Sequence, residues 1–291
     1  MIKPYYGFTN DVVFGWVMDN KEFCMYLIQI IIPELKIKDI EYVNRQHDVS
    51  TPDASRDVRL DILVKDTGDR LYDIEMQVAK EQDLGARMRY YQSKIDSYAL
   101  RKGKSFHELK ESFVIFLCDF DPFGFGKLRY SFSNYEDELG KECKLNDKSQ
   151  RIIINSKGNN QKISKDLQAL VDLMNGRPKK LNKHFDYAIK EIAKINASSE
   201  KRRTIMTFEE KLNEVRYEGM EKGKAEGIAV GEKRGIALGE RKGKAMGTKA
   251  VVETYYELGQ DRQAALTAVK KLNLISDQEA EELVNKVYGD N

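Results

Sequence analysis

Two segments decide the fold of this chain: Arg59-Leu-Asp-Ile-Leu-Val64 and Leu71-Tyr-Asp-Ile-Glu-Met-Gln77. Both are rich in the branched and aromatic residues that strands favour, and a gap containing Gly68 separates them. A short gap with glycine between two such runs is typical of a β-hairpin. The sequence therefore predicts antiparallel strands over residues 57–64 and 70–78.

Acidic side chains are placed on both predicted strands of this hairpin. Asp61 lies in the first strand, and Asp73, Glu75 and Gln77 alternate along the second, so that these three point to one face. Carboxylates brought together across a hairpin repel one another unless a proton or a cation neutralises them. Because Mg²⁺ takes oxygen ligands and keeps several waters, the pattern favours a divalent metal site.

A second interpretation of the same pattern is an acidic sheet face in contact with solvent. Antiparallel sheets commonly have one polar, hydrated face and one face packed on a core. The apolar residues expected to form the packed face are Ile62, Leu63, Val64, Ile74, Met76 and Val78. The hairpin residues alone leave both interpretations open.

Asp61, followed one hairpin later by Glu75-Met-Gln77, resembles the core of the PD-(D/E)XK nuclease superfamily. The whole chain is more closely similar to the recombination-promoting nuclease (Rpn) and transposase-type proteins of bacteria. Other segments that carry this resemblance are Asn10-Asp-Val-Val-Phe14, Arg87-Met-Arg-Tyr-Tyr91, Asn155-Ser-Lys-Gly158 and Arg203-Thr-Ile-Met206. With the glycine-repeat tail, which is also typical, the resemblance spans nearly all 291 residues.

The order of predicted elements agrees with the fold that this resemblance implies. Helical spacing runs from Phe8 to Ile32, breaks at Asp19-Asn-Lys and ends at Pro33, which cannot donate a helical hydrogen bond. Further strands are predicted over 37–43, 112–120, 128–135 and 150–155, and further helices over 86–100 and 163–174. Helices covering both faces of the sheet give an α/β fold: a three-layer α/β/α PD-(D/E)XK nuclease-like core with a mixed sheet, followed by an all-α C-terminal tail.

The resemblance also implies a site and an activity. Asp61 and Glu75 would hold Mg²⁺, with Mn²⁺ as a substitute, helped by waters and by the backbone carbonyl of Met76. Gln77 stands where the superfamily usually has lysine and would orient the attacking water as the third catalytic residue. The implied function is metal-dependent endonuclease cleavage of DNA, associated with recombination or mobile elements.

Further residues are predicted to support this site. The resemblance makes Asp11 a third acidic ligand or a supporting group, although its position also suits a helix N-terminal charge. Arg87, Tyr90 and Lys94 have helical spacing on one face, opposite the apolar stripe, and would contact phosphate. A solvated polar helix side is the alternative for these three residues.

The lysine missing at position 77 calls for another cation in the site. Lys65, Arg87 and Lys94 are the candidates that the sequence offers. Asp57 and Asp73 are weaker ligand candidates than Asp61 and Glu75, because both suit the hydrated part of a hairpin.

Bulk properties limit the partners and the location of the protein. The net charge is only +2, so DNA binding must come from a local basic face. The three cysteines show no CxxC spacing and the three histidines are far apart, which argues against zinc and disulfides. With no signal peptide and no apolar run long enough to cross a membrane, we expect a cytoplasmic protein without a membrane partner.

The sequence divides the chain into four parts. We predict a nuclease-like domain over 1–178, a basic helical linker over 179–216, a glycine-repeat helix over 217–249 and a small helical unit over 250–291. Glycine recurs at every fourth position from 219 to 247, and each helical glycine costs about 1 kcal/mol relative to alanine. Close approach of a second helix would compensate, which predicts a homodimer through the tail. A solvated linker helix is the alternative.

A function from another class competes with the nuclease. The near-neutral charge and the missing lysine suit a non-catalytic binding or assembly protein that acts through its helical tail. The combination of Asp61, Glu75 and Gln77 favours the nuclease. A DDE-type transposase lacks support, because no third acidic residue follows on a helix in the expected setting.

Overall fold

The structure, a computed structural model, describes residues 5–49, 58–80, 83–100, 102–159 and 162–289. The chain divides into two compact units, residues 1–206 and 207–291. The first unit contains the whole β-sheet, and the second contains helices only.

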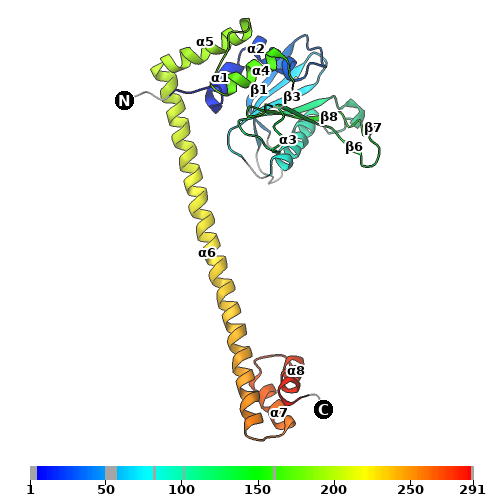
Figure 1. Ribbon diagram of the computed structural model, residues 1–291, viewed down its shortest axis with the longest axis vertical. Helices are drawn as coiled ribbons and strands as arrows, with labels where there is room; N and C mark the ends of the chain where they lie inside the picture. The colour runs from blue at the N-terminus through cyan, green and yellow to red at the C-terminus, as the bar shows by residue number, and fades with distance from the viewer. Residues whose placement is uncertain (1–4, 50–57, 81–82, 101, 160–161, 290–291) are drawn as a thin grey trace. The chain divides into compact units, whose positions relative to one another are not determined.

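The first unit is built on a six-stranded sheet with the strand order β1-β2-β3-β4-β8-β5 (Figure 1). Its strands are β1 (Ile40–Val49), β2 (Val58–Asp66), β3 (Leu71–Gln77), β4 (Ser112–Cys118), β5 (Arg129–Phe132) and β8 (Ser149–Asn155). β1, β2 and β3 are antiparallel neighbours, β3, β4 and β8 are parallel, and β5 is antiparallel to β8. The predicted mixed sheet and the predicted hairpin are confirmed.

The centre of the sheet is the buried strand that the apolar run predicted. Every residue of β4 is buried between β3 and β8. In register, Gln77 pairs with Cys118 and Cys118 pairs with Asn155, so three parallel strands end at the same edge. The sequence did not predict the hairpin of β6 (Tyr135–Glu136) and β7 (Gly140–Lys144), whose residues are mostly exposed and lack apolar alternation.

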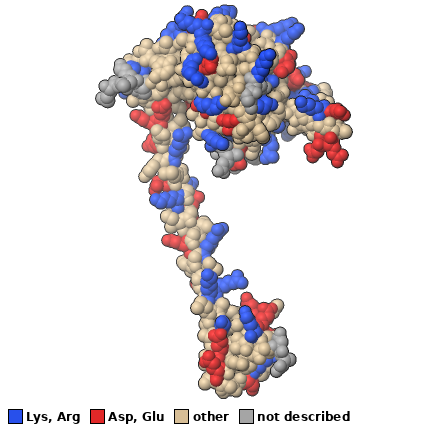
Figure 2. All heavy atoms as spheres, in the orientation of Figure 1, with Lys and Arg blue, Asp and Glu red and all other residues tan. Residues whose placement is uncertain are grey.

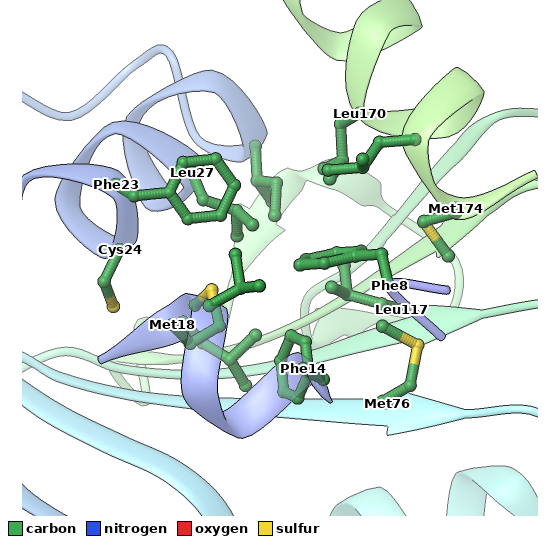
Figure 3. Packing of buried hydrophobic residues seen from close by; sticks show 14 of the residues in the cluster. Phe8, Phe14, Met18, Phe23, Cys24, Leu27, Met76, Leu117, Leu170 and Met174 are labelled. Carbon is green, nitrogen blue, oxygen red and sulfur yellow. The ribbon is translucent and has the colours of Figure 1, made fainter. Parts of the chain in front are cut away.

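Four helices lie on one face of the sheet: α1 (Asp11–Met18), α2 (Lys21–Ile31), α4 (Lys165–Met174) and α5 (Lys183–Ala197). The predicted break between the first two is confirmed, because the side chain of Asn20 accepts from the backbone N–H of Phe23 and starts a new helix. Figure 3 shows aromatic and aliphatic side chains of α1, α2 and α4 packing against Met76 and Leu117 of the sheet.

The other face of the sheet is covered by α3 (Leu84–Ala99), which packs on its own apolar cluster with Phe116 and Ile153. A short 3₁₀ helix, η1 (Phe106–Glu108), follows α3. The three-layer arrangement is therefore confirmed (Figure 1). Two residues were assigned to the wrong place: Leu63 alternates to the α3 face, and Val78 lies beyond β3, where half of it is exposed.

A tight turn follows β8 at the edge where the parallel strands end. Asn155 donates its side-chain N–H to the carbonyl oxygen of Lys127 at 3.0 Å, which draws two chain segments together. At Gly158, an added Cβ would lie 2.7 Å from the carbonyl carbon of Lys127, closer than real contacts allow. Lys157 binds Asp119 across the same turn at 2.7 Å.

The helical part of the chain contains α6 (Ser199–Glu257), α7 (Arg262–Leu272) and α8 (Asp277–Tyr288). All eight repeat glycines lie within α6, and a Cβ added to any of them would meet nothing within 4 Å. The second unit has a small apolar core of Val252, Val269, Ala280 and Val284. Ser276 and Glu279 form a capping box at the start of α8. In the described part of the chain, no helix is both long and apolar enough to span a membrane.

Candidate active site

The acidic residues of β3 lie underneath α3. Met76 points into the core on the opposite face, so its neighbours in the strand point toward α3 (Figure 3). Asp73, Glu75 and Gln77 are only 0%, 1% and 5% exposed. The interpretation of these residues as a solvated sheet face is therefore wrong, because α3 excludes water from that face.

The two predicted ligands meet where regular pairing between β2 and β3 stops. The backbone pairing ends at Ile62 and Ile74. At the next position, the N–H of Asp61 donates to Oε1 of Glu75 at 2.8 Å, and the N–H of Met76 donates to Oδ2 of Asp61 at 3.2 Å. At this position the side-chain carboxylates, in place of backbone carbonyls, accept the hydrogen bonds between the two strands. Each carboxylate is held by a backbone N–H of the opposite strand.

Arg87 of α3 reaches down to the same place. Its Nη1 donates to Oε1 of Gln77 at 2.7 Å, and its Nη2 lies 3.9 Å from Oε2 of Glu75. The hydroxyl of Tyr91 accepts from Nη2 at 2.9 Å, and the guanidinium carbon is 5.8 Å from the ring centre of Phe116. Arg87 is therefore the cation that stands beside Gln77.

The buried carboxyl groups are strongly perturbed. Burial away from water raises the pKa of Asp73 and of Glu75 well above the usual range, and the nearby charge of Asp61 raises both further. Arg87 opposes these effects only in part. Both carboxyl oxygens of Asp73 are buried, and a side-chain hydrogen bond with Glu75 lowers the pKa of Asp73 only in part. Without a cation beside them, these carboxyl groups therefore favour the protonated, neutral form.

The residues present fit a divalent cation in kind. Asp61 and Glu75 offer carboxylate oxygens, and the carbonyl of Met76 points to the same side of β3 as its N–H, toward Asp61. Oxygen donors suit a hard ion such as Mg²⁺, and the charge of a bound ion would favour the ionised form of these carboxyl groups. Within the described residues, no three His, Cys, Asp or Glu side chains are already grouped to hold a metal ion.

Other predicted residues take different positions. Lys94 is buried, with Nζ 5.2 Å from the ring centre of Tyr90, which is itself half-buried. The prediction that Arg87, Tyr90 and Lys94 lie opposite the apolar stripe is wrong, because Lys94 is buried and Arg87 reaches the sheet beside that stripe. Lys65 forms ion pairs near the hairpin turn, 3.3 Å from Asp69.

The remaining acidic candidates differ in how the structure places them. Asp11 is exposed in the first turn of α1, a helix that packs on the sheet face away from α3. Asp57 lies outside the described residues. Asp73 deserved more weight than the hairpin pattern suggested, since its two-residue spacing from Glu75 placed both on the covered face.

Comparison with known proteins agrees with this geometry. A family model described as PD-(D/E)XK nuclease family transposase matches residues 6–157, which include the sheet strands, α3 and the carboxylate pair. No curated protein and no solved structure matches the chain significantly. Because the match covers more than half of the chain, this protein belongs to the PD-(D/E)XK nuclease family transposases.

Proposed function

We propose that the protein is a metal-dependent DNA endonuclease of recombination or mobile-element type. One observation carries the proposal: Asp61 and Glu75 face each other in the gap between β2 and β3, where each bonds to the other strand. Family membership supports a nuclease- or transposase-type function. In the proposal, Asp61, Glu75 and the Met76 carbonyl hold Mg²⁺, with Mn²⁺ as a substitute.

The surrounding residues have distinct roles in this mechanism. A bound divalent ion would supply Lewis acidity and lower the pKa of a water molecule. Gln77 accepts a hydrogen bond from Arg87 through Oε1, so its amide N–H groups are turned away from Arg87 and can donate to water or to a phosphate oxygen. Arg87 fixes that amide and adds positive charge, which stabilises a transition state with negative charge on the phosphoryl oxygens.

The proposal extends to the partners. DNA is the substrate, and a homodimer forms through α6, so that two active sites can address two strands. Apolar side chains are exposed along α6 at Met220, Ile228, Leu238 and Met246. Their positions share one side of the helix with Gly231 and Gly235, where a second backbone can approach closely. A cytoplasmic location stays a prediction from the sequence.

A non-catalytic assembly protein is the second candidate, and the position of Arg87 favours it. The guanidinium lies 3.9 Å from Glu75 and supplies part of the positive charge that a metal ion would bring. Three protein ligands for a metal are not grouped among the described residues. In this case Asp61 and Glu75 would only hold β2 and β3 together.

Cleavage and metal binding should be measured on the same preparations. Supercoiled plasmid is incubated with the protein with and without Mg²⁺, and Mn²⁺ binding is followed by calorimetry. We expect Mg²⁺-dependent nicking or linearisation, and at least about a hundredfold loss of rate in Asp61→Ala and Glu75→Ala, since even outer-shell changes cost 10- to 100-fold. Asp69→Asn, an exposed acid of the same hairpin, is the control. Equal Mn²⁺ affinity in both alanine variants and the wild type would support the assembly function.

A further inference from the structure

A second polar and aromatic site lies on the α3 side of the sheet. A cavity of about 510 Å³ lies between the start of α3 and the edge strand β5. Its lining includes Gly85 and Arg89 of α3, Phe132 of β5, Arg151 of β8 and Phe123 of the preceding loop. Among the described residues that line this cavity, none is acidic. None of these five residues belongs to the carboxylate site.

Strand register brings an aromatic ring and a guanidinium together at this cavity. Phe132 pairs with Arg151 across β5 and β8, two residues away from the pair Tyr130 and Ile153. That second pair packs in the cluster under α3, so Phe132 and Arg151 point to the same face. The ring centre of Phe123 is 5.4 Å from that of Phe132, and each side chain is 41% exposed.

The loop that carries Phe123 is held in one conformation. The carboxylate of Asp121 accepts from the N–H groups of Phe123 at 3.2 Å, Gly124 at 3.1 Å and Gly126 at 2.7 Å. It also accepts from the hydroxyl of Tyr130 at 3.1 Å. A partly exposed aromatic ring on a preorganised loop loses little conformational entropy when a flat ligand stacks on it.

The two arginines give the cavity a positive character. Nε of Arg151 is buried and has no hydrogen-bond partner among the described residues. The charge of Arg151 acts on Asp96 and Asp147 only at longer range. Arg89 is exposed at the rim. Guanidinium groups bind phosphate oxygens in pairs and stack on planar rings, so their geometry suits a nucleotide.

This positive character is local. Figure 2 shows acidic side chains gathered on the β6–β7 hairpin, and both signs of charge mixed over the rest of the visible face of the first unit. The exposed acidic residues of the hairpin are Glu136, Asp137, Glu138 and Glu142. A phosphate group that approaches this edge is repelled by the hairpin and attracted by Arg89 and Arg151.

We propose that this cavity binds one unpaired nucleotide of a DNA strand, beside the cleavage site. The base stacks on the ring of Phe132, and the ring of Phe123, which is tilted by 59° against that of Phe132, contacts the edge of the base. The phosphate of the same nucleotide contacts Arg89 and Arg151. Stacking on aromatic rings next to arginines is how proteins bind single-stranded nucleic acid without reading its sequence. The proposal rests on the proposed DNA substrate and adds a preference for unpaired over fully paired DNA.

Binding is tested with the full-length protein in EDTA, so that cleavage does not interfere. Fluorescence anisotropy compares a labelled 12-nucleotide single strand with the duplex of the same sequence. We expect Phe132→Ala to raise the single-strand Kd about tenfold and the duplex Kd less than twofold. Gly85→Leu should raise the single-strand Kd in the same way, because the space beside Gly85 is open and the new side chain would fill the cavity. Phe106→Ala, which changes an exposed ring elsewhere, is the control.

Two results of this comparison would overturn the proposal. Unchanged single-strand affinity in both variants would show that no base enters the cavity. An equal loss of affinity for the single strand and for the duplex would show that the cavity contacts only the DNA backbone. If the variants instead change the mass in solution and leave DNA binding intact, the apolar wall binds a protein surface.

A cross-linking experiment on the wild-type chain does not depend on any variant folding. A single strand carrying 5-iodouracil is irradiated in the complex, and the linked peptide is identified by mass spectrometry. We expect links to Phe123 or Phe132, and links found only elsewhere would contradict the proposal. Asp61→Ala should still bind the single strand more tightly than the duplex, because Asp61 does not line the cavity. This variant therefore separates a failure of the proposed nuclease function from a failure of the proposed nucleotide site.

Discussion

Arg87 changes what single substitutions in the site are expected to do. Its Nη1 is 2.7 Å from Oε1 of Gln77, the position where the superfamily usually has lysine. From the sequence alone, Gln77→Lys is predicted to be tolerated, because it restores the usual cation. With Arg87 already in place, a lysine at position 77 brings two positive charges together under α3, where burial strengthens their repulsion.

We therefore expect Gln77→Lys to lower the cleavage rate, and Gln77→Lys with Arg87→Gln to recover much of it. Gln77→Ala should bind Mn²⁺ about as well as the wild type and lose most cleavage, since in the proposed mechanism it removes only the group that positions water. Single-turnover cleavage rates and calorimetry on the four proteins measure both effects. A double variant no faster than Gln77→Lys would show that Arg87 does more than supply charge.

The β2–β3 turn is the element on which the carboxylate pair depends, and Asp66 holds it. The carboxylate accepts from the N–H groups of Gly68 at 2.8 Å and Arg70 at 3.0 Å, from Nε of Arg70 at 2.6 Å and from the hydroxyl of Tyr72 at 2.9 Å. Burial alone would raise the pKa of Asp66, but these hydrogen bonds outweigh it and lower the pKa. The turn is thus fixed by an ionised group.

Asp66→Ala should lower the free energy of unfolding by about 3–5 kcal/mol, the usual loss when one member of a buried ion pair is removed. Because the folded-state pKa is lowered, the stabilisation is present above the unfolded pKa of about 4 and is lost as the pH falls through the folded-state pKa. Urea unfolding between pH 7 and pH 3 measures both effects. The variant should lose less stability on acidification than the wild type, and Asp69→Asn should follow the wild type.

The glycines of α6 provide a test at the level of one helix. In a single chain, the methyl group of an alanine at Gly231 or Gly235 would have no other atom within 4 Å. Either substitution should therefore stabilise the helix by up to about 1 kcal/mol. If a second copy packs on this side, the same methyl groups separate the backbones and weaken the dimer. Gly247→Ala is the control, since it lies about 120–160° around the helix from these positions. Sedimentation equilibrium distinguishes the two cases: unchanged association in all variants means a linker helix.

Sequence patterns predict the strands and helices better than they predict which face of each strand or helix is buried. Alternation along residues 71–77 and the apolar run at 112–118 were sufficient for the sheet, because strand period and burial are local properties. That α3 covers the acidic face, and that Arg87 meets Gln77, depends on packing between distant segments. The burial of Asp73 does not follow from the sequence for the same reason, because a hydrated hairpin and a covered hairpin have the same local pattern.

At the scale of the whole molecule, the sheet unit and the helical unit have separate cores. Ile205 of α6 is fully buried in the core of the first unit, and Lys201 lies 5.2 Å from the ring centre of Trp16. Val252 of the same helix is buried with α7 and α8. A chain that ends after position 216 keeps the first set of contacts and loses the repeat.

We expect residues 1–216 to unfold at nearly the same temperature as the sheet unit in the full chain, and to be monomeric if α6 carries the dimer. Calorimetric scanning and light scattering measure the two properties. A truncated chain with the same oligomeric state as the full chain would assign association to the first unit. Retained plasmid cleavage by the truncated chain would place the whole active site in that unit.

The turn after β8 has a consequence for how this family can vary over evolutionary time. An added methyl group at position 158 would press into the backbone of Lys127, and backbone atoms cannot rotate out of the way as a side chain can. A change at 158 must therefore be accompanied by a rearranged chain path before β5. Aligned relatives should therefore retain glycine there wherever they retain asparagine at the position of Asn155, and should lose both together where the loop has changed length.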